Sequence, residues 1–272
     1  METHFFKYQE TTLHFLKSGY GSNVLLAFHG FGQDHKALSE LFEKLSNQYT
    51  VYAFDIFFHG KSKWNRGKTP LEKSFWKSLL VEFLRQYEID RFSLLGYSMG
   101  GKFALASLEA FPKKIENVFL LAPDGIKTSM WYSLATYPLV FRRLFKSMVF
   151  NPYRFHRIAN LAFKIGLIDK GILRFAESQM NTQEKRKQVY SSWVVFRHLK
   201  FSMDHIASII NSNNIDLTII VGKYDKIITG KNMNRLVKRL TNYNLEILET
   251  GHNGLISKWA NGFPKIQNGT QC

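Results

Sequence analysis

A serine flanked by glycines is the feature of this sequence best suited to covalent chemistry. It lies in the segment Gly96-Tyr97-Ser98-Met99-Gly100-Gly101, with a glycine two residues before and two residues after Ser98. An apolar run at 92–95 precedes the segment and a helix-like stretch at 102–111 follows it, which predicts a strand, a sharp turn and a helix. The turn is strained, and side chains at the flanking glycines would collide there. The serine hydroxyl would therefore stand exposed at a helix start, where N–H groups favour developing negative charge.

Two residues that can assist a nucleophilic serine follow predicted strands later in the chain. Asp225 comes after the unbroken apolar run at 217–221, which is typical of a buried parallel strand, and His252 comes after the run at 245–248. In open α/β sheets, ligand chemistry takes place at the edge formed by the carboxyl ends of the strands. We therefore expect Asp225 and His252 to lie near Ser98.

A second aspartate could take the place of Asp225. Asp124 follows the apolar run at 118–121, which also predicts a strand. Asp225 is the preferred acid and Asp124 the alternative. Each of these residues also has an ordinary structural interpretation: Ser98 as a helix cap, Asp225 as a turn former and His252 as a surface histidine.

Two earlier motifs complete the pattern. The apolar run at 24–28 ends in His29-Gly30-Phe31-Gly32, and a later strand-like run ends in Asp55-Ile56-Phe57-Phe58-His59-Gly60-Lys61-Ser62. With the serine segment and the order serine, aspartate, histidine, the chain resembles the α/β-hydrolase superfamily. It is most similar to the cap-bearing esterases and carbon–carbon bond hydrolases of that group, over about residues 20–125 and 205–258.

The resemblance implies an α/β-hydrolase fold, with a mostly parallel central sheet flanked by helices, and a serine hydrolase mechanism. Ser98 would attack a carbonyl carbon, His252 would act as general base and Asp225 would orient it. The backbone N–H groups of Phe31 and Met99 would form the oxyanion hole. No metal or organic cofactor is expected, because protein groups fill every role. A carboxylic ester of a small or acyl-chain substrate is the first choice. A carbon–carbon bond hydrolase or lyase is the alternative, and a catalytically silent ligand-binding protein is a further one.

Three histidines near these motifs are assigned supporting or surface positions. His29 is expected to be structural and to orient the oxyanion loop beside Gly30. His59 is also expected to be structural. His35 is expected to face solvent on the helix that follows the loop.

The alternation of strands and helices stops after Asp124. Residues 124–204 are expected to form a helical cap, inserted between core segments at 1–123 and 205–272. The cap stretch is rich in aromatic residues. Some of these should face the cleft, and an aromatic ceiling suits an apolar or acyl substrate.

The chain is strongly basic, with 37 lysines and arginines against 21 aspartates and glutamates. The basic residues form no recognisable nucleic-acid module, so no nucleic-acid partner is expected. A solvated basic surface is the simplest interpretation, and attraction to anionic substrates or lipid surfaces is the alternative. The stretch 138–150 predicts a basic amphipathic helix that either packs on the main domain or makes weak contact with an anionic membrane. Its apolar face is predicted to consist of Phe141, Leu144, Phe145 and Met148, and its basic residues are Arg142, Arg143 and Lys146.

Targeting signals are not evident. The first residues lack a basic and then apolar leader pattern, and no stretch reaches the roughly 18 apolar residues of a membrane span. The single cysteine, Cys272, excludes a disulfide within the chain, which favours a reducing compartment. A cytoplasmic protein of undetermined oligomeric state is therefore expected.

The remaining elements are predicted from their apolar periodicity. Residues 5–16 should form an antiparallel hairpin at the sheet edge, and 36–45 and 71–87 should form helices. The stretch 262–272 is predicted to be a short polar tail.

Overall fold

A central sheet of nine strands organises the computed structural model, which describes residues 2–128 and 130–262. The strand order is β1-β2-β4-β3-β6-β7-β8-β9, and the short β5 pairs with β2. The strands are β1 (Glu2–Tyr8), β2 (Thr11–Ser18), β3 (Asn23–Phe28), β4 (Tyr49–Phe54), β5 (Lys63–Trp64), β6 (Phe92–Tyr97), β7 (Ile115–Leu121), β8 (Asp216–Gly222) and β9 (Asn244–Leu248).

Strand direction follows from the sequence pattern. The unbroken apolar runs form β3, β6 and β8, which pair in parallel with their neighbours and are covered on both faces. β1 and β2 form the predicted antiparallel hairpin at one edge, and β2 pairs antiparallel with β4. The parallel strands bring their carboxyl ends to one edge of the sheet, where the segments that follow β3, β6 and β8 meet.

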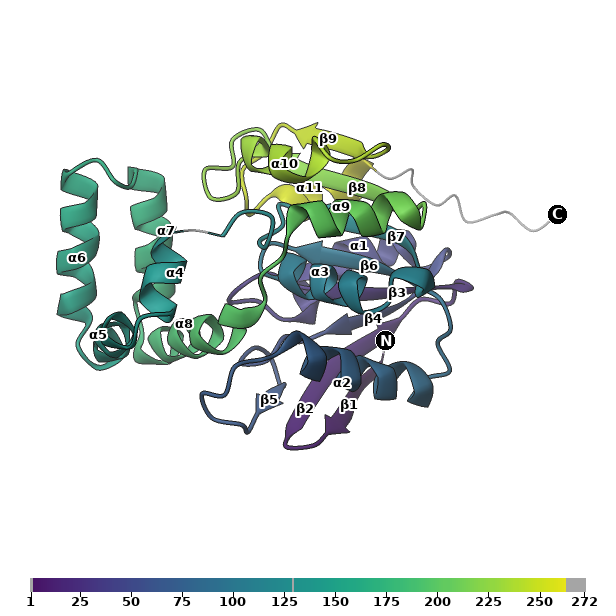
Figure 1. The fold of residues 1–272 in the computed structure, drawn as a ribbon, viewed down its shortest axis with the longest axis horizontal. Coiled ribbons are helices and arrows are strands. Elements are labelled where there is room, and N and C mark those ends of the chain that lie inside the picture. The colour runs from purple at the N-terminus through teal and green to yellow at the C-terminus, as the bar shows by residue number, and fades with distance from the viewer. Residues whose placement is uncertain (1, 129, 263–272) are drawn as a thin grey trace.

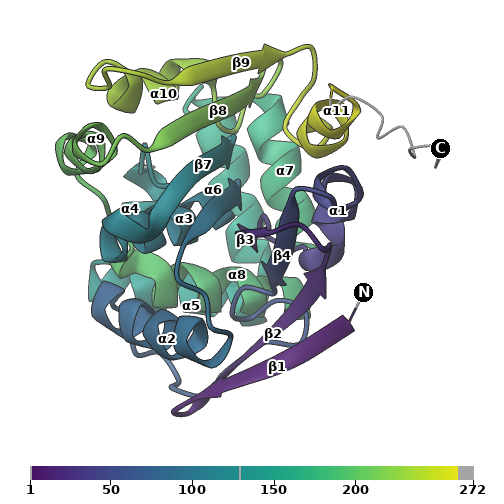
Figure 2. The same ribbon diagram turned by 90° about the vertical axis from the view of Figure 1, so that its right-hand side faces the viewer.

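Helices cover both faces of the sheet (Figure 2). Apolar side chains of α2, α3, α9 and α10 pack on one face, and those of α1 and α11 pack on the other. These helices are α1 (Ser39–Leu45), α2 (Lys73–Gln86), α3 (Gly100–Ala110), α9 (Met203–Ser212), α10 (Gly230–Val237) and α11 (Leu255–Gly262). The predicted mostly parallel sheet flanked by helices is confirmed by this layered arrangement.

Five helices are inserted between β7 and β8 and stand to one side of the sheet (Figure 1). They are α4 (Met130–Thr136), α5 (Leu139–Phe150), α6 (Pro152–Lys164), α7 (Lys170–Met180) and α8 (Gln183–Val195). Their buried side chains form a separate apolar cluster that includes Phe145, Val149 and Tyr190. The division into a core and a cap at residues 124 and 204 stays a prediction.

The structure refines several predicted elements. The helix expected at 36–45 begins as a 3₁₀ turn, η1 (His35–Leu38), and α2 is shorter than the predicted 71–87. α11 was not predicted, and the polar tail at 263–272 lies outside the described residues. Within the described part of the chain, no helix is long and apolar enough to cross a membrane.

The predicted apolar face of the helix at 138–150 is wrong in part. α5 buries Phe145, together with Val149 one turn later, against α8. Phe141 and Leu144 remain 42% and 38% exposed. Met148 is partly buried against the same cluster, as predicted. The helix therefore packs through Phe145, Met148 and Val149, and Phe141 and Leu144 are left outside.

A buried arginine joins the inserted helices. The side chain of Arg186 on α8 donates from Nε to the carbonyl of Val149 and from Nη1 to the carbonyl of Met180, each at 3.0 Å. These carbonyls lie at the C-terminal ends of α5 and α7, where no helical N–H group is available. One guanidinium therefore caps two helices at once.

Arg186→Ala should loosen the insertion without unfolding the sheet. It would leave buried carbonyls without donors, at a cost of about 1–3 kcal/mol. Hydrogen exchange of the backbone amides should accelerate in α5, α7 and α8, while β3 and β6 stay protected. Lys187→Ala is the matched control, because Lys187 is the exposed neighbour on the same helix. Equal exchange in both variants would contradict the capping role.

Candidate active site

The backbone at Ser98 is held in a strained conformation. Ser98 lies between β6 and α3 with φ of 50°, a region that side-chain-bearing residues adopt only at a cost. Its N–H donates to the carbonyl of Leu121 at 2.9 Å, and its carbonyl accepts from the N–H groups of Gly101 at 2.9 Å and Asp124 at 2.8 Å. The neighbouring β7 and its following loop therefore hold the turn in place.

The two flanking glycines are required by close packing. A Cβ at Gly100 would lie 2.1 Å from the carbonyl oxygen of Phe28, at the end of β3. A Cβ at Gly96 would lie 2.8 Å from the carbonyl oxygen of Gly100. Any side chain at Gly100 would push β3 away from the turn, so the predicted collision is present in the structure.

His252 and Asp225 form a hydrogen-bonded line with Ser98. His252 Nε2 lies 3.0 Å from Ser98 Oγ, and His252 Nδ1 lies 2.6 Å from Asp225 Oδ2. The other carboxylate oxygen, Asp225 Oδ1, accepts the backbone N–H groups of Ile227 at 2.8 Å and Ile228 at 2.9 Å. The carboxylate is fully buried and all its contacts are donors, so it can accept a proton-bearing Nδ1 and leave Nε2 facing the serine.

Tyr97 holds His252 in position through a hydrogen bond and a ring contact. Its hydroxyl donates to the backbone carbonyl of His252 at 3.0 Å, and its ring packs against the imidazole. Burial, followed by the nearby charge of Asp225, raises the pKa of the Tyr97 phenol well above its ordinary value. Tyr97 therefore stays a neutral donor.

Asp124 does not contact the histidine. Its Oδ2 lies 3.0 Å from Lys102 Nζ, and its Oδ1 accepts the N–H of Gly125 at 2.7 Å. Lys102 is buried on α3, and its ammonium group also lies 4.0 Å from the ring centroid of Tyr132 on α4. Burial disfavours the charge of Lys102, but Asp124 and Tyr132 raise its pKa above the ordinary value. Of the two candidate acids, only Asp225 is in place to orient His252.

The loop after β3 carries the predicted oxyanion donor. Gly30 N–H donates to Gln33 Oε1 at 3.0 Å, which fixes the loop beside Phe31. His29 is fully buried below it, with Nδ1 2.7 Å from the carbonyl of Gly30 and Nε2 accepting the N–H of Ile56 at 3.0 Å. These partners fit only a neutral ring with its proton on Nδ1. The amides of Phe31 and Met99 stay the predicted oxyanion donors.

Burial keeps two of the histidines near this loop uncharged. Desolvation, followed by the proximity of His59, lowers the pKa of His29 to about 3. Desolvation lowers the pKa of His59 to about 4, against the opposing effect of its hydrogen bond to the carbonyl of Phe57. Both histidines are buried and hydrogen-bonded to backbone groups, and their structural role stays a prediction.

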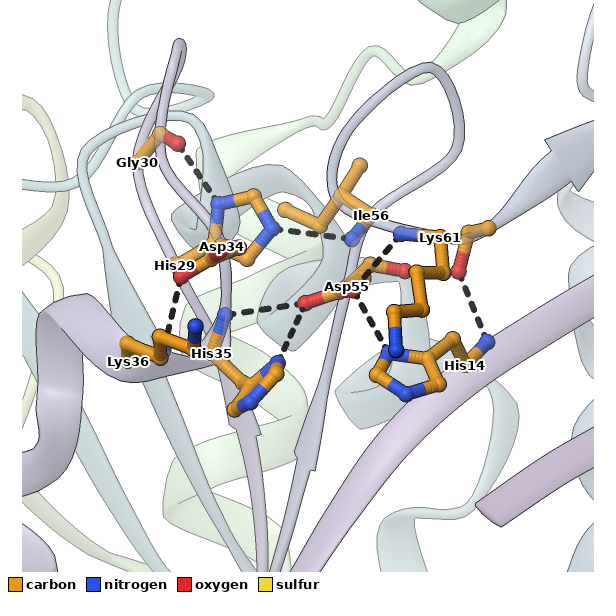
Figure 3. Close-up of polar contacts among 10 residues, drawn as sticks. His14, His29, Gly30, Asp34, His35, Lys36, Asp55, Ile56 and Lys61 are labelled. Atoms are coloured by element: carbon orange, nitrogen blue, oxygen red, sulfur yellow. Dashed lines mark hydrogen bonds and ion pairs between the residues drawn. The ribbon is translucent and has the colours of Figure 1, made fainter. Parts of the chain in front are cut away.

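The prediction that His35 faces solvent is wrong. His35 is buried, and its backbone N–H and Nδ1 lie 2.9 Å and 2.8 Å from Asp55 Oδ1 (Figure 3). The other oxygen, Oδ2, lies 2.7 Å from Nδ1 of His14 and accepts the N–H of Lys61 at 2.9 Å. A buried carboxylate requires hydrogen-bond donors. His35 can provide them because β3 and β4 end side by side, which places η1 next to Asp55.

The group formed by His14, His35 and Asp55 has donor atoms within 4.8 Å of one another, as a metal site would. However, each oxygen of Asp55 already accepts two hydrogen bonds, and both Nδ1 atoms are engaged with it. Burial works against the charge of Asp55, but these donors hold the pKa of its carboxyl well below the ordinary value. We interpret the group as a hydrogen-bonded brace between β2, η1 and β4. Sequence analysis missed His14, which stands among apolar residues of β2 with no motif around it.

Comparison with known proteins supports the same fold. The family model described as alpha/beta hydrolase fold matches residues 23–258. A 117-residue stretch is 30% identical to 1-acylglycerol-3-phosphate O-acyltransferase ABHD5 of Rattus norvegicus, and spans 42% of this chain and 33% of that protein. The curated relatives reported first are matched over about a third of their own length.

Solved structures share the fold at low sequence identity. A thermophilic esterase from Thermogutta terrifontis has a TM-score of 0.69 and 16% identity, with 96% of each chain covered. The enol-lactonase of Burkholderia xenovorans has a TM-score of 0.63 and 17% identity, with 96% of each chain covered. At these identities the likeness shows the fold alone.

Stability should fall as the pH drops below 6.5. An unfolded histidine has a pKa near 6.5, whereas folded His29 and His59 have pKa values of about 3 and about 4. Below pH 6.5 the unfolded chain therefore binds protons at these two histidines that the folded chain does not bind. The free energy of unfolding keeps its full value above pH 6.5 and decreases progressively toward pH 4. The free energy of unfolding, measured in urea from pH 7.5 to 4.5, should decrease, and His59→Gln should make that decrease less steep. An unchanged slope in His59→Gln would show that His59 titrates normally in the folded protein. Asp55 contributes only at lower pH, since an unfolded aspartate has a pKa near 3.9.

Proposed function

The chain belongs to the α/β-hydrolase family, and on this premise we propose that it is a serine hydrolase that cleaves a carboxylic ester through an acyl-enzyme. The observation that carries the proposal is the continuous hydrogen-bonded line from Asp225 through His252 to Ser98. A serine with this base and acid beside it is the arrangement needed for nucleophilic acyl transfer.

The proposed reaction has two steps. Ser98 Oγ bonds to the carbonyl carbon while His252 Nε2 takes its proton, and the alcohol then leaves with that proton. Water attacks the resulting acyl-serine, again with His252 as base, and releases the acid and the free serine. Asp225 stabilises the imidazolium formed in each step. The amides of Phe31 and Met99 would bind the oxyanion, and one such donor is typically worth about 2.7–4 kcal/mol.

We also propose that residues 124–204 form a cap over this site. Gln188 on α8 donates from Nε2 to the carbonyl of Phe58 at 2.9 Å, which ties the insertion to the loop after β4. Phe31, beside the proposed oxyanion hole, packs against the apolar cluster of the insertion around Phe145 and Tyr190. An aromatic surface next to the nucleophile suits an apolar acyl group.

The names of two similar proteins agree with acyl chemistry. The rat relative is named as an O-acyltransferase, and the Thermogutta neighbour as an esterase. Both names describe reactions of acyl groups, which supports an ester substrate over a carbon–carbon bond.

Exchange of each candidate acid should separate the proposed roles. Asp225→Asn preserves the shape of the side chain but removes the charge beside His252, and should lower kcat by up to about 10⁴-fold. Asp124→Asn should have a much smaller effect, because Asp124 is bound to Lys102 and not to His252. The assay is hydrolysis of p-nitrophenyl esters of graded chain length, with Ser98→Ala as the blank. If Asp124→Asn were the crippling change, the proposed triad would be wrong.

A further inference from the structure

The outer helices of the insertion expose an unusual amount of apolar surface. We define the cap tip surface as the exposed side chains of α5, α6 and the loop that follows α6. Its apolar members are Leu139, Val140, Phe141, Leu144, Phe150, Tyr153, Ile158, Leu161, Phe163, Ile165 and Leu167. Val140 is 72% exposed, and Leu161 and Ile165 are 59% and 61% exposed. Exposed apolar residues are normal when scattered singly, but a contiguous set indicates an interaction site.

α6 presents two different faces. Ile158 and Leu161 on α6 and Ile165, the residue just after its C-terminal end, recur at helical spacing, so their exposed side chains lie along one side of the helix. An adjoining face packs inward, where Ala159 is buried and Phe155 joins the apolar cluster of the insertion. In Figure 1, α6 is the part of the insertion farthest from the sheet, with its length running across the outer end. The exposed side chains of α6 therefore lie on the element of the insertion that is most distant from the sheet.

The same segment is basic and lacks acidic residues. No aspartate or glutamate occurs between Asp124 and Asp169. Six lysines and arginines lie on α5 and α6: Arg142, Arg143, Lys146, Arg154, Arg157 and Lys164. Among the ion pairs of the described residues, none involves any of these six. Arg142 and Lys146 lie near Lys68 of the sheet domain. Arg154, Arg157 and Lys164 share α6 with the exposed Ile158 and Leu161.

The combination of exposed apolar side chains and basic residues indicates which partner fits the cap tip surface. Apolar side chains with arginines and lysines along their border match the interface of an anionic bilayer, where acyl chains lie beneath phosphate groups. A second copy of this chain that docked through the same surface would bring the same positive charge to the contact and be repelled. The absence of acidic residues excludes the compensating pairs that such a self-contact would need.

We propose that the cap tip surface docks the protein on anionic lipid bilayers, with Ile158, Leu161 and Ile165 entering the headgroup region and the arginines and lysines contacting lipid phosphates. The docking requires no catalysis, so it stands independently of the proposed ester hydrolysis. If both hold, the insertion brings the proposed active site next to a reservoir of acyl esters.

Co-sedimentation with vesicles tests the docking. Vesicles of phosphatidylcholine alone are compared with vesicles containing phosphatidylglycerol, at 0.05 M and 0.5 M salt. At low salt, binding to the anionic vesicles should be at least tenfold stronger, and salt should weaken it because screening shortens the reach of the charges. The Ser98→Ala variant should bind as well as the wild type, which separates docking from catalysis.

Two sets of substitutions and one control locate the contact. Arg154→Gln, Arg157→Gln and Lys164→Gln together should reduce anionic binding at least tenfold, and Ile158→Ser with Leu161→Ser should do the same. Lys77→Gln, Lys113→Gln and Lys238→Gln remove the same charge from exposed positions on the sheet domain and should leave most of the binding intact. Circular dichroism and thermal unfolding verify that each variant is folded.

Other outcomes would overturn the proposal. Equal binding to both kinds of vesicle would show that anionic lipid is not recognised. An equal loss of binding in the lysine control would show that the net charge of the protein, and not the cap tip surface, causes the binding. Unchanged binding of Ile158→Ser with Leu161→Ser would remove the apolar contact. Concentration-dependent dimers in sedimentation velocity that disappear in this variant would assign the surface to a second copy instead.

Discussion

The strained turn at Ser98 is the constraint on which the rest of the structure depends. A positive φ at a serine persists only where the surroundings force it, and here β7 and its loop supply hydrogen bonds to both backbone groups of Ser98. The turn in turn requires glycine at 96 and 100, because β3 and α3 approach too closely for a side chain. The close packing of β3, β6 and β7 around the turn therefore also determines the position of the Ser98 hydroxyl.

A second buried network supports the opposite side of the same edge. Asp55 collects four donors from β2, η1 and the loop after β4. Neutral His29 links the loop after β3 to the backbone of Ile56. These hydrogen bonds tie the loops after β3 and β4 to β2 and η1 through side chains.

The elements that were predicted correctly are those with local signals in the sequence. Unbroken apolar runs predicted β3, β6, β7 and β8, and the glycines around Ser98 predicted the turn, because each signal resides in a few adjacent residues. The partners of Asp55 could not be predicted, since His14 and His35 are distant in the chain and meet only through the sheet. Asp225 was preferred over Asp124 without certainty, because both follow parallel strands. Their different partners, His252 for Asp225 and Lys102 for Asp124, are brought together only by the fold. The buried face of α5 depends on its contact with α8, which its own periodicity does not encode.

The central claim is that the line Asp225–His252–Ser98 makes one serine nucleophilic. Labelling with a fluorophosphonate, followed by peptide mapping, tests this most directly, because the reagent bonds to an activated serine whatever the natural substrate. The account predicts a single label on Ser98, lost in Ser98→Ala and after unfolding in urea, with the Ser98→Ala protein still folded. Labelling at another serine that persists in Ser98→Ala, or no labelling of the folded wild-type protein, would contradict it.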